Sequence, residues 1–183
     1  MKRKIFFVAA LAVGIGVLGN TVSAQVQMNG GESRIERKVR SEILSLPYYG
    51  VFDAIGYTTN GSTVTLNGFV VRPITKSDAE GSVKDIEGVE RVVNNIEVLP
   101  LSPNDDRIRL RTLNRLSGQG GSLFYYFLGT NPSIRIIVKS GRIQLEGFVN
   151  NKADSNLANI LARVVTGTFG VTNNLQILKG EPR

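Results

Sequence analysis

Three arginines spaced four residues apart form the clearest chemical pattern in this sequence: Arg107, Arg111 and Arg115. Residues four apart lie on one side of a helix, so these side chains would form a continuous basic row. A basic row suits an anionic surface of lipid headgroups, where each cation contributes about 1 kcal/mol. We expect the opposite, buried side of the same helix to carry three leucines: Leu110, Leu113 and Leu116.

A short aromatic run follows the basic row. Residues 123–128 are all apolar or aromatic, and tyrosine prefers the boundary between lipid and water. We therefore predict that three aromatic side chains bind the membrane beside the arginines: Phe124, Tyr125 and Tyr126. The alternative is that the arginines form an ordinary solvated helix face and the aromatic rings fill the core.

Few residues in this chain are suited to catalysis. It has no His, Cys or Trp, which excludes a Ser-His-Asp triad, a thiol nucleophile, an imidazole or thiolate zinc site and a disulfide. Asp105 and Asp106 lie at the start of a predicted helix, where the helix dipole favours acids, so we interpret them as capping residues. The glycine-rich segment 118–122 lacks the Gly-Lys-Ser/Thr sequence of a phosphate-binding loop. We expect no enzymatic activity, no metal and no cofactor.

The first 24 residues have the three-part pattern of a secretory signal peptide. A basic start at residues 2–4 precedes an uncharged run at 5–18, and small residues lead to Ala24. The apolar run is shorter than the roughly 20 residues of a membrane-spanning helix, so we favour cleavage near Ala24 over an uncleaved anchor. No Cys follows the run, so a bacterial lipid anchor is excluded. We expect a periplasmic or secreted protein that does not act on nucleic acid.

Charge divides the remaining chain into two parts. Residues 25–100 carry eight Lys and Arg against ten Asp and Glu, a net charge of −2, whereas residues 101–183 carry eleven against five, a net charge of +6. The change falls at a short linker between Pro100 and Pro103. The expected divisions are a signal peptide at 1–24, a flexible N-terminal segment at 25–32, a first domain at 33–100, a second domain at 101–179 and a tail at 180–183.

The two parts are also copies of each other. The segment 64–70 matches 143–149, and the segment 92–99 matches 171–178, both at an offset of 79 residues. A constant offset over this length indicates two tandem domains of about 70 residues rather than a solenoid of short repeats. Domains of this size bury only about 60% of their unfolded surface, so we expect the two to pack on each other.

Each copy has the pattern helix, strand, strand, helix, strand. In the first copy, Ser33 and Glu36 form a capping box in sequence, and Asn60-Gly61 is a strong hairpin signal. The predicted elements of the first copy are a helix from Ser33 to Pro47, strands over 52–58 and 63–70, a helix ended by Gly88, and a strand over 92–99. Those of the second are a helix capped by Ser102, strands over 134–139 and 142–149 joined at Ser140-Gly141, a helix ended by Gly167, and a strand over 171–178.

This order predicts an α+β fold of two tandem αββαβ domains, each a three-stranded mixed sheet covered on one face by two helices. Gly68 and Gly147 interrupt the strand patterns, and we expect a covering helix to approach the sheet closely there. The alternative is an irregular sheet edge. The last helix is marked by five apolar residues: Leu157, Ile160, Leu161, Val164 and Val165.

The repeated pattern resembles the BON domain. A Val-x-Leu-x-Gly-x-Val strand is followed, after a helix, by Gly-Val-x-x-Val-x-Asn-x-Ile-x-Val, although the second copy spreads the Gly-Val pair over residues 167–171. The residues that carry the resemblance are Gly68, Gly88 and Asn94 in the first copy and Gly147, Gly167 and Asn173 in the second. A signal peptide before two such domains is similar to the osmotically inducible periplasmic protein family.

The resemblance implies an exported, non-enzymatic protein that attaches to phospholipid membranes or other envelope components. We predict an envelope-binding module that docks on anionic phospholipid and acts in envelope stress protection. It would not be lipid-anchored, so contact must come from its folded surface. The alternative is a protein-interaction or chaperone-like periplasmic module that binds exported polypeptides.

Overall fold

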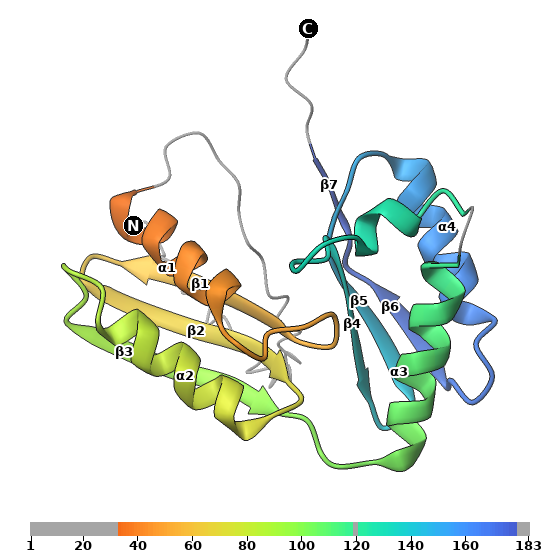
Figure 1. Cartoon of the computed structure of the whole chain (residues 1–183), viewed down its shortest axis with the longest axis horizontal. Helices are drawn as coiled ribbons and strands as arrows, with labels where there is room; N and C mark the ends of the chain where they lie inside the picture. The colour runs from red at the N-terminus through yellow and green to blue at the C-terminus, as the bar shows by residue number, and fades with distance from the viewer. Residues whose placement is uncertain (1–32, 119–120, 179–183) are drawn as a thin grey trace, which may run out of the picture.

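The computed structural model describes residues 33–118 and 121–178 as two αββαβ units (Figure 1). The predicted signal peptide at 1–24, the N-terminal segment at 25–32 and the tail at 180–183 lie outside the described residues. Within the described ranges, no helix has the length and apolar character needed to cross a membrane.

The first unit has the predicted order of elements. They are α1 (Arg34–Ser45), β1 (Ala54–Asn60), β2 (Thr63–Val70), α2 (Pro73–Lys84) and β3 (Arg91–Val98). The strand order is β1-β2-β3, with β1 antiparallel and β3 parallel to the central β2. Both helices lie on one face of this mixed sheet, which confirms the predicted fold class (Figure 1).

The second unit repeats the order with two additions. Its elements are α3 (Pro103–Leu116), the 3-10 helix η1 (Phe124–Phe127), β4 (Ile134–Lys139), β5 (Arg142–Val149), α4 (Lys152–Arg163), β6 (Gly170–Asn173) and β7 (Gln176–Ile177). The predicted strand at 171–178 is therefore divided into β6 and β7. Both pieces pair with β5 in the same register, so they occupy one position in the sheet.

The local sequence signals act largely as predicted. Ser33 and Glu36 form a complete capping box, and the Ser102 side chain accepts a hydrogen bond from the backbone of Asp105. The first hairpin differs slightly, because Asn60 pairs with Thr63 and the turn is Gly61-Ser62. The expected turn at Ser140-Gly141 is confirmed.

Gly68 and Gly147 do permit a close approach, but the approaching backbone belongs to a strand and not to a helix. A Cβ on Gly68 would lie 2.0 Å from the carbonyl oxygen of Ala54, and one on Gly147 would lie 2.0 Å from that of Ser133. Both glycines have positive φ, 123° and 106°. The expectation of a covering helix is therefore wrong. At each glycine the central strand comes close to the backbone of its antiparallel neighbour instead.

The other motif residues make equivalent contacts in the two units. The Asn94 side-chain amide donates to the Lys76 carbonyl at 3.1 Å, and that of Asn173 donates to the Ser155 carbonyl at 3.0 Å. Each side-chain oxygen also accepts from the backbone N–H two residues later in the chain. These asparagines tie the second helix of each unit to the last strand.

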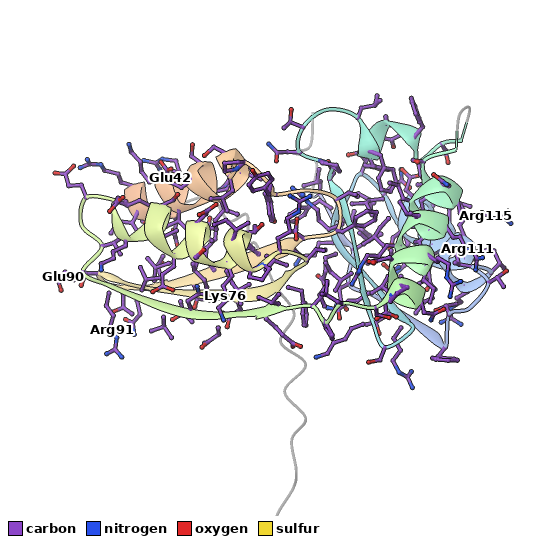
Figure 2. The ribbon with its side chains drawn as sticks, turned by 60° about the horizontal axis from the view of Figure 1, so that its bottom comes forward. Glu42, Lys76, Glu90, Arg91, Arg111 and Arg115 are labelled. Carbon is purple, nitrogen blue, oxygen red and sulfur yellow. The ribbon has the colours of Figure 1, made fainter. Side chains whose placement is uncertain are left out.

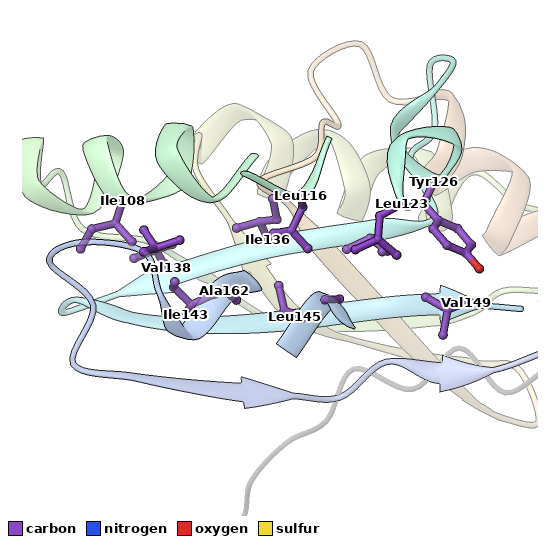
Figure 3. Close-up of a cluster of buried hydrophobic side chains, with 13 residues drawn as sticks. Ile108, Leu116, Leu123, Tyr126, Ile136, Val138, Ile143, Leu145, Val149 and Ala162 are labelled. Atoms are coloured by element: carbon purple, nitrogen blue, oxygen red, sulfur yellow. The ribbon is translucent and has the colours of Figure 1, made fainter. Parts of the chain in front are cut away.

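The two units pack on each other as expected. Figure 3 shows the core of the second unit, which lies between its sheet and its helices. The loop between α1 and β1 packs against this core through Val51 and Phe52. The Ile136 backbone N–H, on β4, donates to the Val51 carbonyl at 2.8 Å. A separate buried cluster joins Ala54, Leu99 and Ile137 across the junction. A loop of the first domain thus contributes to the core and the sheet edge of the second.

Candidate functional site

The arginine row lies on the exposed side of α3. Arg107, Arg111 and Arg115 are all exposed, and Figure 2 shows Arg111 and Arg115 on the side of α3 that faces away from the first domain. The buried side of the helix carries Asp105, Ile108, Arg109, Thr112 and Leu116. The three arginines therefore form one continuous basic surface, as their spacing predicted.

The expected leucine face is only partly correct. Leu116 is 1% exposed and Leu113 is partly buried against the core, but Leu110 is 54% exposed. The helix is rotated because buried polar contacts fix its orientation. The Asp105 carboxylate accepts from the backbone N–H groups of Ser140 and Gly141 at 2.9 and 2.8 Å.

A second polar contact holds α3 in the same orientation. Arg109 is 3% exposed, donates from Nη2 to the Val138 carbonyl at 2.8 Å and forms an ion pair with Asp106. The capping interpretation of the two acids was thus incomplete. Asp105 anchors the helix to the β4–β5 turn, and Asp106 neutralises a buried arginine.

Exposed apolar side chains lie on α4 and in the turn that follows it, and Arg111 contacts this turn. Arg111 donates from Nη1 to the Thr166 carbonyl at 3.1 Å, beside Gly167. Three apolar residues of this region are exposed: Ile160 at 59%, Val164 at 57% and Phe169 at 76%. The exposed surface of α3 and α4, which we call the α3–α4 face, therefore combines cations with apolar side chains.

The sequence pattern does not point to these three apolar residues as a site. Their spacing marks Ile160 and Val164 only as part of a helix, and no motif includes Phe169. The sequence carries no signal for their exposure, because positions 157, 160, 161, 164 and 165 follow the i, i+3, i+4, i+7, i+8 spacing of a single buried helix face. Ala158 and Ala162 take the most buried positions instead, with no exposed side-chain surface.

The aromatic run is divided between surface and core. Tyr126 is 4% exposed, accepts from the Asn150 backbone at 2.8 Å and donates to the Asp154 carboxylate at 2.7 Å. Burial raises the pKa of Tyr126 well above its usual range. Its predicted place on the membrane surface is therefore wrong, because its ring completes the core of the second unit (Figure 3).

Its two neighbours remain accessible. Phe124 is 37% and Tyr125 46% exposed, and the Tyr125 hydroxyl donates to Asp154 at 2.9 Å. Asp154 lies in the first turn of α4, so this hydrogen bond places Tyr125 beside the start of that helix. The turn that contacts Arg111 follows the other end of α4. Tyr125 therefore lies near the opposite end of α4 and does not flank Arg111.

The corresponding surface of the first unit has a different charge. Gly88 lies against Ile35 in the first unit, and Gly167 lies against Ile108 in the second, so Ile35 and Ile108 are equivalent. On this alignment, Arg34, Lys38 and Glu42 occupy the positions of Arg107, Arg111 and Arg115. The groove between α1 and α2 also contains Asp85 and Glu87, and Glu87 forms an ion pair with Arg34. The acids Asp85 and Glu87 correspond, at the repeat offset of 79, to Val164 and Thr166. The α3–α4 face has Val164 and Thr166 at these positions, and among the described residues no ion pair of its three arginines is present.

Comparison with known proteins is consistent with this architecture. The family model described as "BON domain" matches residues 31–100 and 125–179, so α3 lies between the two matched segments. Osmotically-inducible protein Y of Escherichia coli (strain K12) is 25% identical over 145 residues, which cover 79% of this chain and 72% of that protein.

Two solved structures also resemble this chain weakly. Both are of CdsD, a structural protein of the type III secretion system of Chlamydia trachomatis. One is 14% identical with a TM-score of 0.32, over 79% of this chain and 92% of that chain. The other, the C-terminal domain, is 13% identical with a TM-score of 0.31, over 78% and 96%. Similarity at this level supports no conclusion about this chain.

Proposed function

This chain belongs to the BON domain family, and from that premise we propose that it is an exported, non-enzymatic protein that docks on anionic phospholipid membranes of the cell envelope through its α3–α4 face. The observation that carries the proposal is the uncompensated basic row beside exposed apolar side chains. Export, to the periplasm or out of the cell, rests on the signal-peptide pattern at residues 1–24. Similarity to an osmotically inducible protein supports a role in envelope stress.

The α3–α4 face supplies two contributions that membrane docking needs. Three arginines near an anionic surface contribute about 1 kcal/mol each, which is weak and sensitive to salt. The side chains of Ile160, Val164 and Phe169 are mostly exposed in solution and gain by entering the boundary of the lipid layer. Together the two contributions give reversible binding that depends on both headgroup charge and apolar contact.

Co-sedimentation with vesicles tests this proposal. The full chain should bind phosphatidylcholine vesicles that contain phosphatidylglycerol, and should bind pure phosphatidylcholine weakly. Replacing the row by Arg107→Glu, Arg111→Glu and Arg115→Glu should abolish binding, because the attraction becomes repulsion. The circular dichroism spectrum should not change, since all three side chains are exposed.

A matched control carries the same change of charge on the first domain: Arg34→Glu, Lys38→Glu and Arg91→Glu, all exposed. This control should bind nearly as well as the parent. Equal binding of the parent to neutral and anionic vesicles, or equal loss in the two triple variants, would rule out docking through the α3–α4 face. Higher salt should weaken binding of the parent.

A further inference from the structure

A cleft of about 210 Å³ lies at the junction of the two domains, and none of the three arginines of the α3 row lines it. One wall comes from the first domain, with Ile43 and Leu44 of α1 and Tyr57 of β1. The other comes from the second domain, with Glu146 and Phe148 of β5. Most of the lining is apolar, so a carboxylate there calls for a physical explanation.

Glu146 is buried, and only one of its oxygens is bonded. The residue is 4% exposed, yet it lines the cleft. Its Oε1 accepts from the Asn174 amide at 2.6 Å and from the Gln144 amide. Within the described residues, no hydrogen bond to Oε2 is present. Burial raises the pKa of this carboxyl above its usual range. A buried acid without a cation is costly and is stabilised by any cation or donor that reaches it.

The nearest arginine in the sheet does not neutralise Glu146. Arg135 is its cross-strand partner in the β4–β5 ladder. Its guanidinium turns instead toward the first domain, where Nη1 donates to the Gly50 carbonyl at 2.7 Å and the group lies 4.3 Å from the centre of the Tyr49 ring. The Arg135 cation therefore binds at the domain junction, and within the described part of the chain Glu146 forms no ion pair.

The repeat shows that the fold itself does not require an acid at this position. The equivalent pair in the first domain is Asn67 and Asn95, whose side-chain amides form a hydrogen bond of 3.4 Å. Glu146 and Asn174 occupy these positions at the offset of 79. Two amides thus complete the same cross-strand contact in the first sheet. The acid occurs only in the copy that faces the cleft, which indicates a ligand rather than a structural need.

We propose that the cleft binds an extended polypeptide segment that presents a lysine or arginine beside apolar residues. The cationic side chain would bind Oε2 of Glu146, and its apolar neighbours would pack on Leu44, Tyr57 and Phe148. Arg40 lies on the α1 wall of the cleft, so the cation must enter along the β5 wall. This site differs from the α3–α4 face in place and in the sign of the charge it selects.

Titration calorimetry with three short peptides tests this site on the full chain. The probes are acetylated, amidated pentapeptides of leucine whose central residue is lysine, norleucine or glutamate. The lysine peptide should bind about tenfold more tightly than the norleucine peptide, which corresponds to one charge-assisted hydrogen bond. The glutamate peptide should bind least. Glu146→Gln should remove the preference for lysine, because glutamine keeps the shape and the two amide contacts but not the charge.

Two further variants keep the result interpretable. Glu42→Gln makes the same change of charge on the other side of α1, in the α1–α2 groove, and should keep the preference for lysine. Gln176→Lys places a cation in the cleft without altering Glu146, and should also remove the preference. The proposal fails if no peptide binds, or if Glu146→Gln still prefers lysine. Vesicle binding should be unchanged in both cleft variants, so this result is independent of membrane docking.

Discussion

The groove between α1 and α2 and the groove between α3 and α4 share a backbone arrangement but carry different charges. In the first, Arg34 and Lys38 face Glu42, Asp85 and Glu87. In the second, the corresponding positions hold three arginines and no acid. The contacts that build each helix pair, the glycine turn and the strand asparagine, are the same in both domains. These contacts do not involve the side chains that differ in charge, so the charged positions can change without loss of the fold.

The domains also differ in how much each needs the other. Val51 and Phe52 of the first domain pack on the second core, and the Val51 carbonyl binds the edge of β4. This loop is rigid because the buried Asp53 carboxylate accepts from the backbone of Gly50 and of Val71 at 2.8 and 2.7 Å. The second domain, which carries the proposed docking surface, therefore depends on a loop of the first for part of its packing.

The largest effect is expected where the two domains are most alike. Gly147→Ala places a Cβ 2.0 Å from the Ser133 carbonyl oxygen, at a φ that alanine adopts with strain. That carbonyl also accepts from the Phe148 backbone and cannot shift freely. We expect a loss of about 3 kcal/mol or more in the free energy of unfolding. Gly68→Ala should match it, as measured by chemical denaturation. Gly81→Ala, at an exposed position inside α2, is the control and should not destabilise the chain. A Gly147→Ala variant as stable as this control would contradict the account.

The dependence of the second domain on the first can be tested by Phe52→Ala. This change removes a partly buried ring from the second core and should cost about 2 kcal/mol, less than a fully buried phenylalanine. Hydrogen exchange of β4 and β5 should accelerate even though the substitution lies in the first domain. Tyr48→Ala, at a 53% exposed residue of the same loop, is the control and should leave β4 unchanged. Acceleration confined to the first domain would show that the domains are independent.

The charge difference between the grooves can be transferred. Glu42→Arg, Asp85→Val and Glu87→Thr copy the residues of the second domain onto the first. Introduced into the triple Arg→Glu variant of α3, they should restore vesicle binding at least about tenfold, because together they add one cation and remove three acids from the groove. A control with the same change of charge outside the groove, Glu90→Arg, Asp78→Val and Glu80→Thr, should restore less. Equal recovery in both would mean that net charge, and not the groove, determines docking.

The smallest effect concerns Glu146 and its neutral counterpart Asn67. Burial raises the pKa of Glu146, so the folded chain holds this proton more tightly than the unfolded chain does. Stability is therefore lost as pH rises from the ordinary carboxyl pKa through the raised value. Glu146→Gln should be more stable than the parent at neutral pH, by less than about 1 kcal/mol. The gain should vanish below about pH 4. A gain that is the same at both pH values would exclude ionisation as its cause, and Asn67→Gln should show no pH dependence.

The sequence alone determined the repeat, the αββαβ order and most element boundaries. The repeat follows from the 79-residue offset between matching segments. The order and boundaries follow from local signals: the capping box at Ser33, the Ser140-Gly141 turn and the alternation of apolar residues along each strand. Local rules act within a few residues, so they hold before any tertiary contact forms. The placement of the three arginines on one side of α3 follows from the same helical spacing.

Only the tertiary structure decided which side chains face solvent and which face another domain. Leu110 is exposed because Asp105 and Arg109 bind β4 and the turn after it, about 30 residues further along the chain. Tyr126 is buried because its ring packs in the core of its domain and its hydroxyl donates to Asp154, although the neighbouring Tyr125 is half exposed. In sequence, Glu146 looks like an ordinary polar residue on the exposed side of a strand. It is buried because it lies at the junction with the first domain. Burial depends on the packing of distant segments, which no local pattern encodes.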